Sequence, residues 1–139
     1  MKYIEKLLSK NSCSEEKRTA VSIGNTGEEI AVKTIKKKGY KVIERNYRTR
    51  LGEIDIIARD KEYICFIEVR MRKRTDFGTP ADTIDKRKRD KIIKAAKMYA
   101  LKNNLYDMPM RFDAVLIDGD FFGGENINVE IIKDAFTTD

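Results

Sequence analysis

The chain contains no histidine among its 139 residues, and this absence excludes several catalytic classes at once. Without an imidazole there is no Ser-His-Asp hydrolase site, no His-based acid-base catalysis, no histidine-metal nuclease and no zinc site of the Cys/His type. The chemistry that stays open is that of carboxylate, Lys, Arg, Tyr, Ser and Thr side chains. These groups act alone or with a metal ion that prefers oxygen ligands.

Cysteine is also scarce, since only Cys13 and Cys65 occur. They lie far apart in the sequence and form no metal-ligand pair, and we expect Cys65, which falls in an apolar run, to be a buried thiol. The polar start of the chain does not resemble a secretion signal, so we expect a reduced, cytoplasmic compartment. No apolar run approaches the ~18 residues of a membrane span, and we expect no membrane partner.

Charged residues are what the chain has in excess. They make up 37% of the sequence, and 29 Lys and Arg against 23 Asp and Glu give a net charge of +6. The length fits one domain with a real core. A basic excess of this size suits a polyanion such as nucleic acid, although many small domains are equally basic without that role.

The pattern of apolar residues predicts the element order α-β-β-β-α-β and a short edge strand. We expect a first helix capped at Asn25 or Thr26 and ending at Gly39, a long basic helix over 82–103, and strands at 40–47, 52–72 (a hairpin), 111–118 and 126–132. The long helix should bury Ile84, Ile92, Ala95, Ala96, Tyr99 and Ala100. This order indicates an α/β domain in which helices pack against a mixed sheet.

The acids Glu53, Asp55 and Glu68 interrupt the apolar residues of the hairpin GEIDIIARDKEYICFIEVRMR, and a buried acid costs on the order of several kcal/mol unless it is neutralised. If the turn centres on Lys61 and Glu62, Asp55 lies opposite Glu68 and Glu53 lies opposite Arg70. An odd loop length would instead place Asp55 and Glu68 on different faces of the sheet.

Two interpretations of these acids stay open. In the first, Arg70 and Arg72 neutralise them in a salt-bridged strip. In the second, Asp55 and Glu68 hold a divalent metal, because Mg²⁺ accepts one or two carboxylates, keeps several waters and binds phosphate oxygens. Such a site would activate water and stabilise the leaving oxygen of a phosphodiester.

Several motifs then point to a known family. The segments Gly52-Glu53-Ile54-Asp55-Ile56-Ile57 and Phe66-Ile67-Glu68-Val69-Arg70, followed by Phe77-Gly78 and by Arg111-Phe112-Asp113, resemble the YraN-type bacterial family, uncharacterised protein family 0102. That family is similar to the PD-(D/E)XK, restriction-endonuclease-like nucleases, including archaeal Holliday-junction resolvases. The resemblance implies a restriction-endonuclease-like core over residues 23–139, with a helical appendage and linker at 1–22.

The resemblance also implies roles for individual residues. Asp55 and Glu68 match two metal ligands, for Mg²⁺ or Mn²⁺, and Glu28 matches an acid that assists the metal site. Arg70 departs from the pattern, which has a lysine there to orient or deprotonate water. Arginine stays protonated and cannot act as a base, but it can clamp a phosphate. Lys88 or Lys86 is a candidate to replace the missing lysine.

Basic residues of the hairpin and the long helix are the expected contacts to DNA. These are Arg72, Lys86, Arg87, Lys88 and Lys91, and the alternative is a charged face that only keeps the protein soluble. Tyr47 and Tyr99 could stack on bases, but we expect them to pack in the core. Arg111 and Asp113 are expected to form a structural pair.

Three functions remain open from the sequence. The first is a Mg²⁺- or Mn²⁺-dependent endonuclease acting on structured or branched DNA. The second is a nucleic-acid-binding protein of the same fold with weak or no catalysis. The third is a structural partner in DNA processing, and a homodimer is compatible with all three.

Overall fold

The computed structural model describes residues 15–72, 84–119 and 127–138, and for 15–25 it describes only the course of a helix. The elements are α2 (Glu15–Lys37), β1 (Lys41–Arg48), β2 (Glu53–Asp60), β3 (Tyr63–Arg72), α3 (Lys86–Lys102), β4 (Met110–Asp118) and β5 (Asn128–Phe136). Cys13, the start of the predicted appendage and the loop with Phe77 and Gly78 lie outside these residues. None of the helices described is long and apolar enough to cross a membrane.

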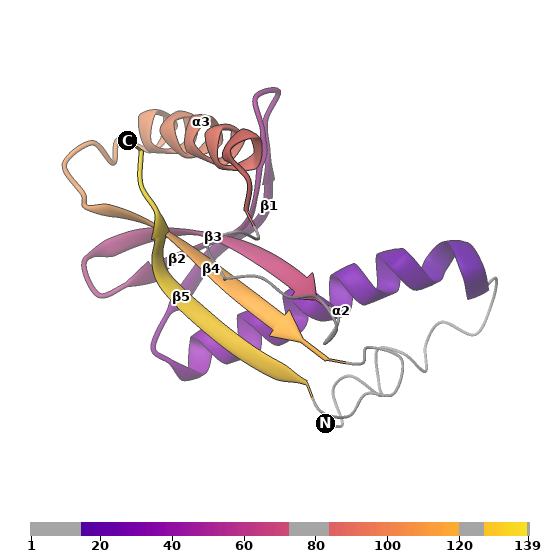
Figure 1. Ribbon diagram of the computed structural model, residues 1–139. Coiled ribbons are helices and arrows are strands. Elements are labelled where there is room, and N and C mark those ends of the chain that lie inside the picture. The colour runs from indigo at the N-terminus through magenta and orange to yellow at the C-terminus, as the bar shows by residue number, and fades with distance from the viewer. Residues whose placement is uncertain (1–14, 73–83, 120–126, 139) are drawn as a thin grey trace.

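The five strands form one mixed sheet in the order β1-β2-β3-β4-β5. The pairs β1/β2, β2/β3 and β4/β5 are antiparallel, whereas β3 and β4 are parallel. Parallel neighbours need a long crossover connection, and α3 lies within it. The predicted α/β class, with a restriction-endonuclease-like α-β-β-β-α-β core and a mixed sheet flanked by helices, is confirmed (Figure 1).

Two hydrophobic clusters cover the two faces of the sheet, and Figure 1 shows α2 and α3 on opposite sides of it. The first cluster joins α3 to the sheet through Ile92 and Tyr99, which pack with Phe66. The second joins α2 through Ile35, which packs with Ile67. All six residues of the buried stripe predicted for the long helix are buried.

The predicted start of the first helix at Asn25 or Thr26 is wrong. Helix α2 begins at Glu15, so Asn25 and Thr26 lie inside it. The helix continues through Gly27, where a Cβ atom would overlap the sulfur of Met71 on β3. The division of the chain at residues 22 and 23 stays a prediction.

Asn46 interrupts the regular alternation of β1. Its φ is 54°, in the left-handed region that Asn tolerates better than most residues. In a regular strand the residues on either side of it would share a face. Here Arg45 pairs with Glu29 on α2, whereas the ring of Tyr47 packs edge-on against Tyr99 of α3. The backbone of Asn46 therefore lets β1 contact both helices.

Candidate functional site

The hairpin has the predicted register. Its ladder pairs Ile56 with Ile67 and continues to Asp60 and Tyr63. Asp55 and Glu68 are the next two positions, at the end where the ladder stops. There the Val69 amide donates a hydrogen bond to Asp55 Oδ2 at 2.9 Å, so a side-chain oxygen takes the place of a backbone carbonyl as its partner. The fork between β2 and β3 thus holds the two acids that the sequence pointed to.

Glu68 is the more deeply buried of these acids, with 4% of its surface exposed. Its Oε1 lies 3.8 Å from Nζ of Lys88 on α3. Its Oε2 is buried and finds no hydrogen-bond partner within the described part of the chain. Because a buried carboxylate oxygen without a partner is costly, this atom marks a place where a proton donor or a cation would stabilise the site.

Burial raises the pKa values of both acids, and a neighbouring negative charge adds to the effect in each case. Burial is the larger cause for Glu68, the charge of Asp55 adds to it, and together they raise the pKa of Glu68 to about 8. Burial also raises the pKa of Asp55, against the hydrogen bond from Val69. Because the negative charge of Asp55 favours the protonated form of Glu68, a cation bound beside the two carboxyls would relieve the repulsion between them.

Glu28 on α2 belongs to the same site, as the resemblance implies. Burial raises its pKa, and the negative charge of Asp55 raises it further. The nearby side chain of Asn46 opposes this by lowering the pKa of Glu28, and Arg45 Nη2 lies 3.9 Å from Glu28 Oε2. The sequence interpretation missed Asn46. The sequence did offer a hint of its role, because Asn is rare within strands and Asn46 lies inside one.

The expected pairing of Glu53 with Arg70 is wrong. The ladder between β2 and β3 ends before it reaches these residues, and Glu53 lies opposite Arg48 on β1. Its carboxylate lies 3.8 Å from Nε of Arg48 and 4.0 Å from Nζ of Lys88. Arg70 still acts on the site, since its positive charge lowers the pKa of Glu68.

A lysine does reach the acids, and it comes from α3. Of the two candidates, Lys88 approaches both Glu68 and Glu53, whereas Lys86 is exposed at the start of the helix. Asp85 caps this end of α3 by accepting a hydrogen bond from the Lys88 amide at 2.8 Å. The cap fixes the first turn and so directs the Lys88 side chain toward the strands.

The donor set fits a hard divalent cation. Within the described residues, no three acid or cysteine side chains are arranged to enclose an ion. Asp55 and Glu68 are therefore a pair of carboxylates, which suits Mg²⁺ or Mn²⁺, since such ions keep several waters. A structural zinc site needs four Cys, His or acid ligands and does not fit. An ion bound beside the two carboxyls would also give Glu68 Oε2 a partner.

The residues predicted to contact nucleic acid fall into two groups. Lys86, Arg87, Lys88 and Lys91 lie on the first turns of α3, and among them Lys88 approaches Glu68 and Glu53. Arg72 is engaged elsewhere, since its guanidinium donates two hydrogen bonds to Asp118 on β4, at 2.8 and 3.1 Å. Its role in binding stays a prediction.

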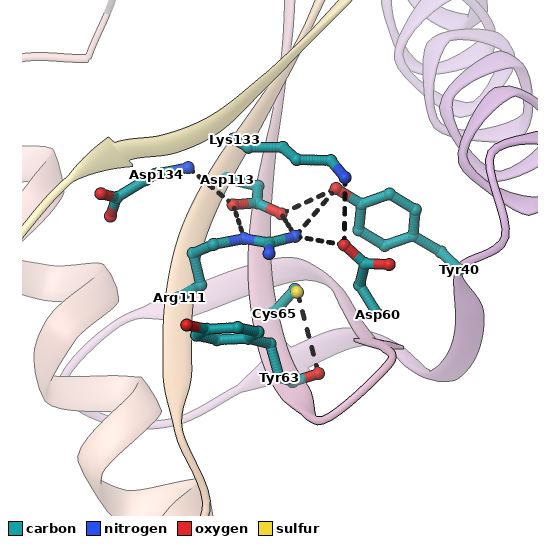
Figure 2. Close-up of polar contacts among 8 residues, drawn as sticks. All are labelled: Tyr40, Asp60, Tyr63, Cys65, Arg111, Asp113, Lys133 and Asp134. Atoms are coloured by element: carbon teal, nitrogen blue, oxygen red, sulfur yellow. Dashed lines mark hydrogen bonds and ion pairs between the residues drawn. The ribbon is translucent and has the colours of Figure 1, made fainter.

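Arg111 and Asp113 form the predicted structural pair, in a buried network apart from the carboxylate site (Figure 2). The guanidinium of Arg111 donates to both oxygens of Asp113 and to Asp60 Oδ2, at 2.8 to 2.9 Å. The Tyr40 hydroxyl donates to Asp113 Oδ2 at 3.0 Å, and Lys133 lies on the outer side of Asp60. The network holds β2, β4 and β5 together and leaves Asp113 fully buried.

The chain is similar to proteins from several bacteria. The model of the family described as Uncharacterised protein family UPF0102 matches residues 27–117, a span that contains Glu28, Asp55, Glu68 and Lys88. A UPF0102 protein of Clostridium kluyveri is 43% identical over 114 residues, which cover 82% of this chain and 93% of that protein. A UPF0102 protein of Acetivibrio thermocellus is 39% identical over 129 residues, covering 91% and 99%. One of Carboxydothermus hydrogenoformans is 44% identical over 110 residues, covering 77% and 93%.

Proposed function

The chain belongs to the UPF0102 family, and we propose that it is a DNA-binding endonuclease that hydrolyses phosphodiester bonds with Mg²⁺ or Mn²⁺. The observation that carries this proposal is the pair of carboxyls in the fork of β2 and β3. The charge of Asp55 raises the pKa of the buried Glu68 there, and Glu68 Oε2 is buried without a partner in the described chain. A cation held between these groups would satisfy both.

Asp55 and Glu68 would hold the ion, with Glu28 behind them. When bound, such an ion lowers the pKa of a coordinated water and stabilises negative charge on a phosphate. The Val69 amide holds one oxygen of Asp55 by its hydrogen bond at 2.9 Å. This fixes the carboxylate before any ligand arrives, and preorganised charges are the ones that stabilise a transition state most.

Two cations beside the acids are suited to a phosphate. Lys88 approaches Glu68 and Glu53, and its ammonium group can donate three hydrogen bonds. Arg70, which replaces the lysine of the related nucleases, can donate two parallel hydrogen bonds to phosphate oxygens. Lys88 and Arg70 then orient the phosphate and balance its charge. The resemblance to Holliday-junction resolvases favours structured or branched DNA as the substrate.

Arg70 also supports a second function, namely DNA binding with weak or no hydrolysis. An arginine stays protonated at any accessible pH and cannot take a proton from water. If Lys88 does not serve the reacting water either, the carboxylates would bind an ion and a phosphate without cutting. Such a protein would act as a binding partner in DNA processing.

One assay separates these two functions. Purified protein is incubated with duplex, single-stranded and four-way-junction DNA, with Mg²⁺, Mn²⁺ or EDTA. We expect cleavage of the junction with either metal and loss of cleavage in Asp55→Asn and Glu68→Gln. Cleavage that survives both substitutions would refute the proposed site. Metal-independent binding without any cleavage by the wild type would favour the second function.

A further inference from the structure

A hollow of about 370 Å³ adjoins the carboxylate site on the side of α3. The segment 48–53, which forms the turn from β1 to β2, lines one side of it, and Lys88 and Lys91 line the other. Lys88 is common to the hollow and the carboxylate site, because its ammonium group also approaches Glu68. The two sites are therefore joined through one side chain.

The turn that lines the hollow is held rigidly. The Thr49 hydroxyl accepts hydrogen bonds from the amides of Leu51 and Gly52, at 3.1 and 3.0 Å. The Thr49 amide and hydroxyl both lie 2.9 Å from the Gly52 carbonyl oxygen, to which they donate. This local network fixes the turn without help from a ligand. A ligand that enters the hollow would not bear the entropic cost of ordering it.

Gly52 also packs the turn directly against the backbone of α3. A Cβ atom at this position would lie within contact distance of the carbonyl oxygen of Lys91 and only 2.9 Å from the carbonyl carbon. Glycine is required for so close an approach of two backbones. The distance between the turn and the helix, and so the shape of the hollow, is set by this contact.

The hollow carries more positive than negative charge. Arg48, Arg50, Lys88 and Lys91 line it together with a single acid, Glu53. Glu53 lies near Arg48 and Lys88. Across the described residues, neither Arg50 nor Lys91 takes part in an ion pair or a side-chain hydrogen bond. Arg50 and Lys91 thus line the same hollow without forming an ion pair with any described acid.

We propose that this hollow binds a backbone phosphate of the DNA strand, next to the phosphate that lies at Asp55 and Glu68. Arg50 and Lys91 supply the charge, and Lys88 lies between the two phosphates. Contacts of this kind carry no sequence information but fix the register of the strand. The inference rests on the proposed function, because the carboxylate site defines which phosphate is the neighbouring one.

The test compares two variants that lower the net charge equally. Arg50→Ala/Lys91→Ala removes the two cations of the hollow, and Lys37→Ala/Lys38→Ala removes two exposed cations at the end of α2, on the opposite face of the sheet. All four side chains are exposed, so both variants should fold, which circular dichroism and thermal melting will verify. Binding of a fluorescent four-way DNA junction is measured in EDTA over a range of salt concentrations.

Arg50→Ala/Lys91→Ala should bind about tenfold more weakly at low salt, and its slope of log Kd against log salt should fall by about 0.9, the value for one lost phosphate contact. The control should keep the wild-type slope. Equal losses of affinity in the two variants would show a general charge effect and would overturn the inference. Wild-type affinity in Arg50→Ala/Lys91→Ala would also overturn it.

The same experiment separates this inference from the proposed hydrolysis. If the slope changes as expected but the wild type never cleaves with Mg²⁺ or Mn²⁺, the phosphate site stands and hydrolysis fails. If the wild type cleaves the junction and the slope does not change, the phosphate site alone fails. A wild type that binds no DNA in EDTA overturns the inference together with the DNA-binding part of the proposed function.

Discussion

Nζ of Lys88 on α3 lies 3.8 Å from Oε1 of the buried Glu68 on β3. The two residues are 20 positions apart, and α3 brings the lysine to the acids from outside the sheet. The nuclease pattern that the chain resembles has a lysine on the strand itself, where this chain has Arg70. The cationic side chain of Lys88 thus lies near the carboxylates, and Arg70 supplies a second positive charge.

Substitution of Lys88 should separate catalysis from metal binding. Lys88→Ala removes a group that balances charge on the phosphate, and we expect cleavage to fall by roughly 10²–10³-fold, as for loss of one preorganised donor. Mn²⁺ affinity should stay the same or rise, because the acids lose a nearby positive charge.

Lys86→Ala is the matched control, since Lys86 is exposed at the start of the same helix. It should keep most of the cleavage activity. Equal losses in the two variants would show that Lys88 contributes only to the general basic charge of α3.

Within the network around Asp60 and Asp113, Arg111 should contribute far more to the free energy of unfolding than Lys133 does. Arg111→Met would leave Asp113 and Asp60 buried without their main cation, at a cost of about 3–5 kcal/mol in the free energy of unfolding. Lys133 contacts the same Asp60 at 3.2 Å, but its side chain is 55% exposed. Lys133→Met should therefore cost less than about 1 kcal/mol. Urea unfolding measures both values, and similar costs would contradict this account of the network.

Asp60 should make the free energy of unfolding depend on pH in the acid range. Its hydrogen bond from Arg111 lowers the pKa of the Asp60 carboxyl, against the effect of burial. The stabilisation is complete above the unfolded pKa of about 3.9 and is lost as pH falls toward the lower folded pKa. The difference in unfolding free energy between wild type and Asp60→Asn should thus be constant from pH 7 to 5 and shrink below pH 4. A difference that grows at low pH would contradict this sign.

The Cys65 thiol should be unreactive in the folded protein. Burial raises its pKa to about 12, so almost no thiolate is present at pH 8. In a Cys13→Ser variant, which leaves Cys65 as the single thiol, reaction with Ellman's reagent should be slow and should accelerate in urea. Rapid, complete reaction without denaturant would contradict the buried position.

The central part of the fold could be predicted because local signals agree there. The hairpin register follows from a two-residue turn, since side chains alternate along both strands and Lys61, with φ 56°, accepts the turn conformation. The buried stripe of α3 follows from helical periodicity. Asp55 and Glu68 could therefore be placed together from the sequence alone.

Features that depend on tertiary contacts could not be predicted in this way. Asn25 and Thr26 favour a helix start, but both lie inside α2, which begins at Glu15. Glu53 was assigned to Arg70 by extending the ladder, which instead ends at Ile56. The local pattern around each position does not show where the helix begins or where the two strands stop pairing.

The central claim is that Asp55 and Glu68 bind a divalent metal ion, and a titration with Mn²⁺ followed by electron paramagnetic resonance tests it without relying on cleavage. The wild type should bind Mn²⁺ with a saturable signal that Mg²⁺ displaces. Asp55→Asn and Glu68→Gln should lose this binding although both variants stay folded. Unchanged Mn²⁺ binding in both variants, or none in the wild type, would contradict the metal site.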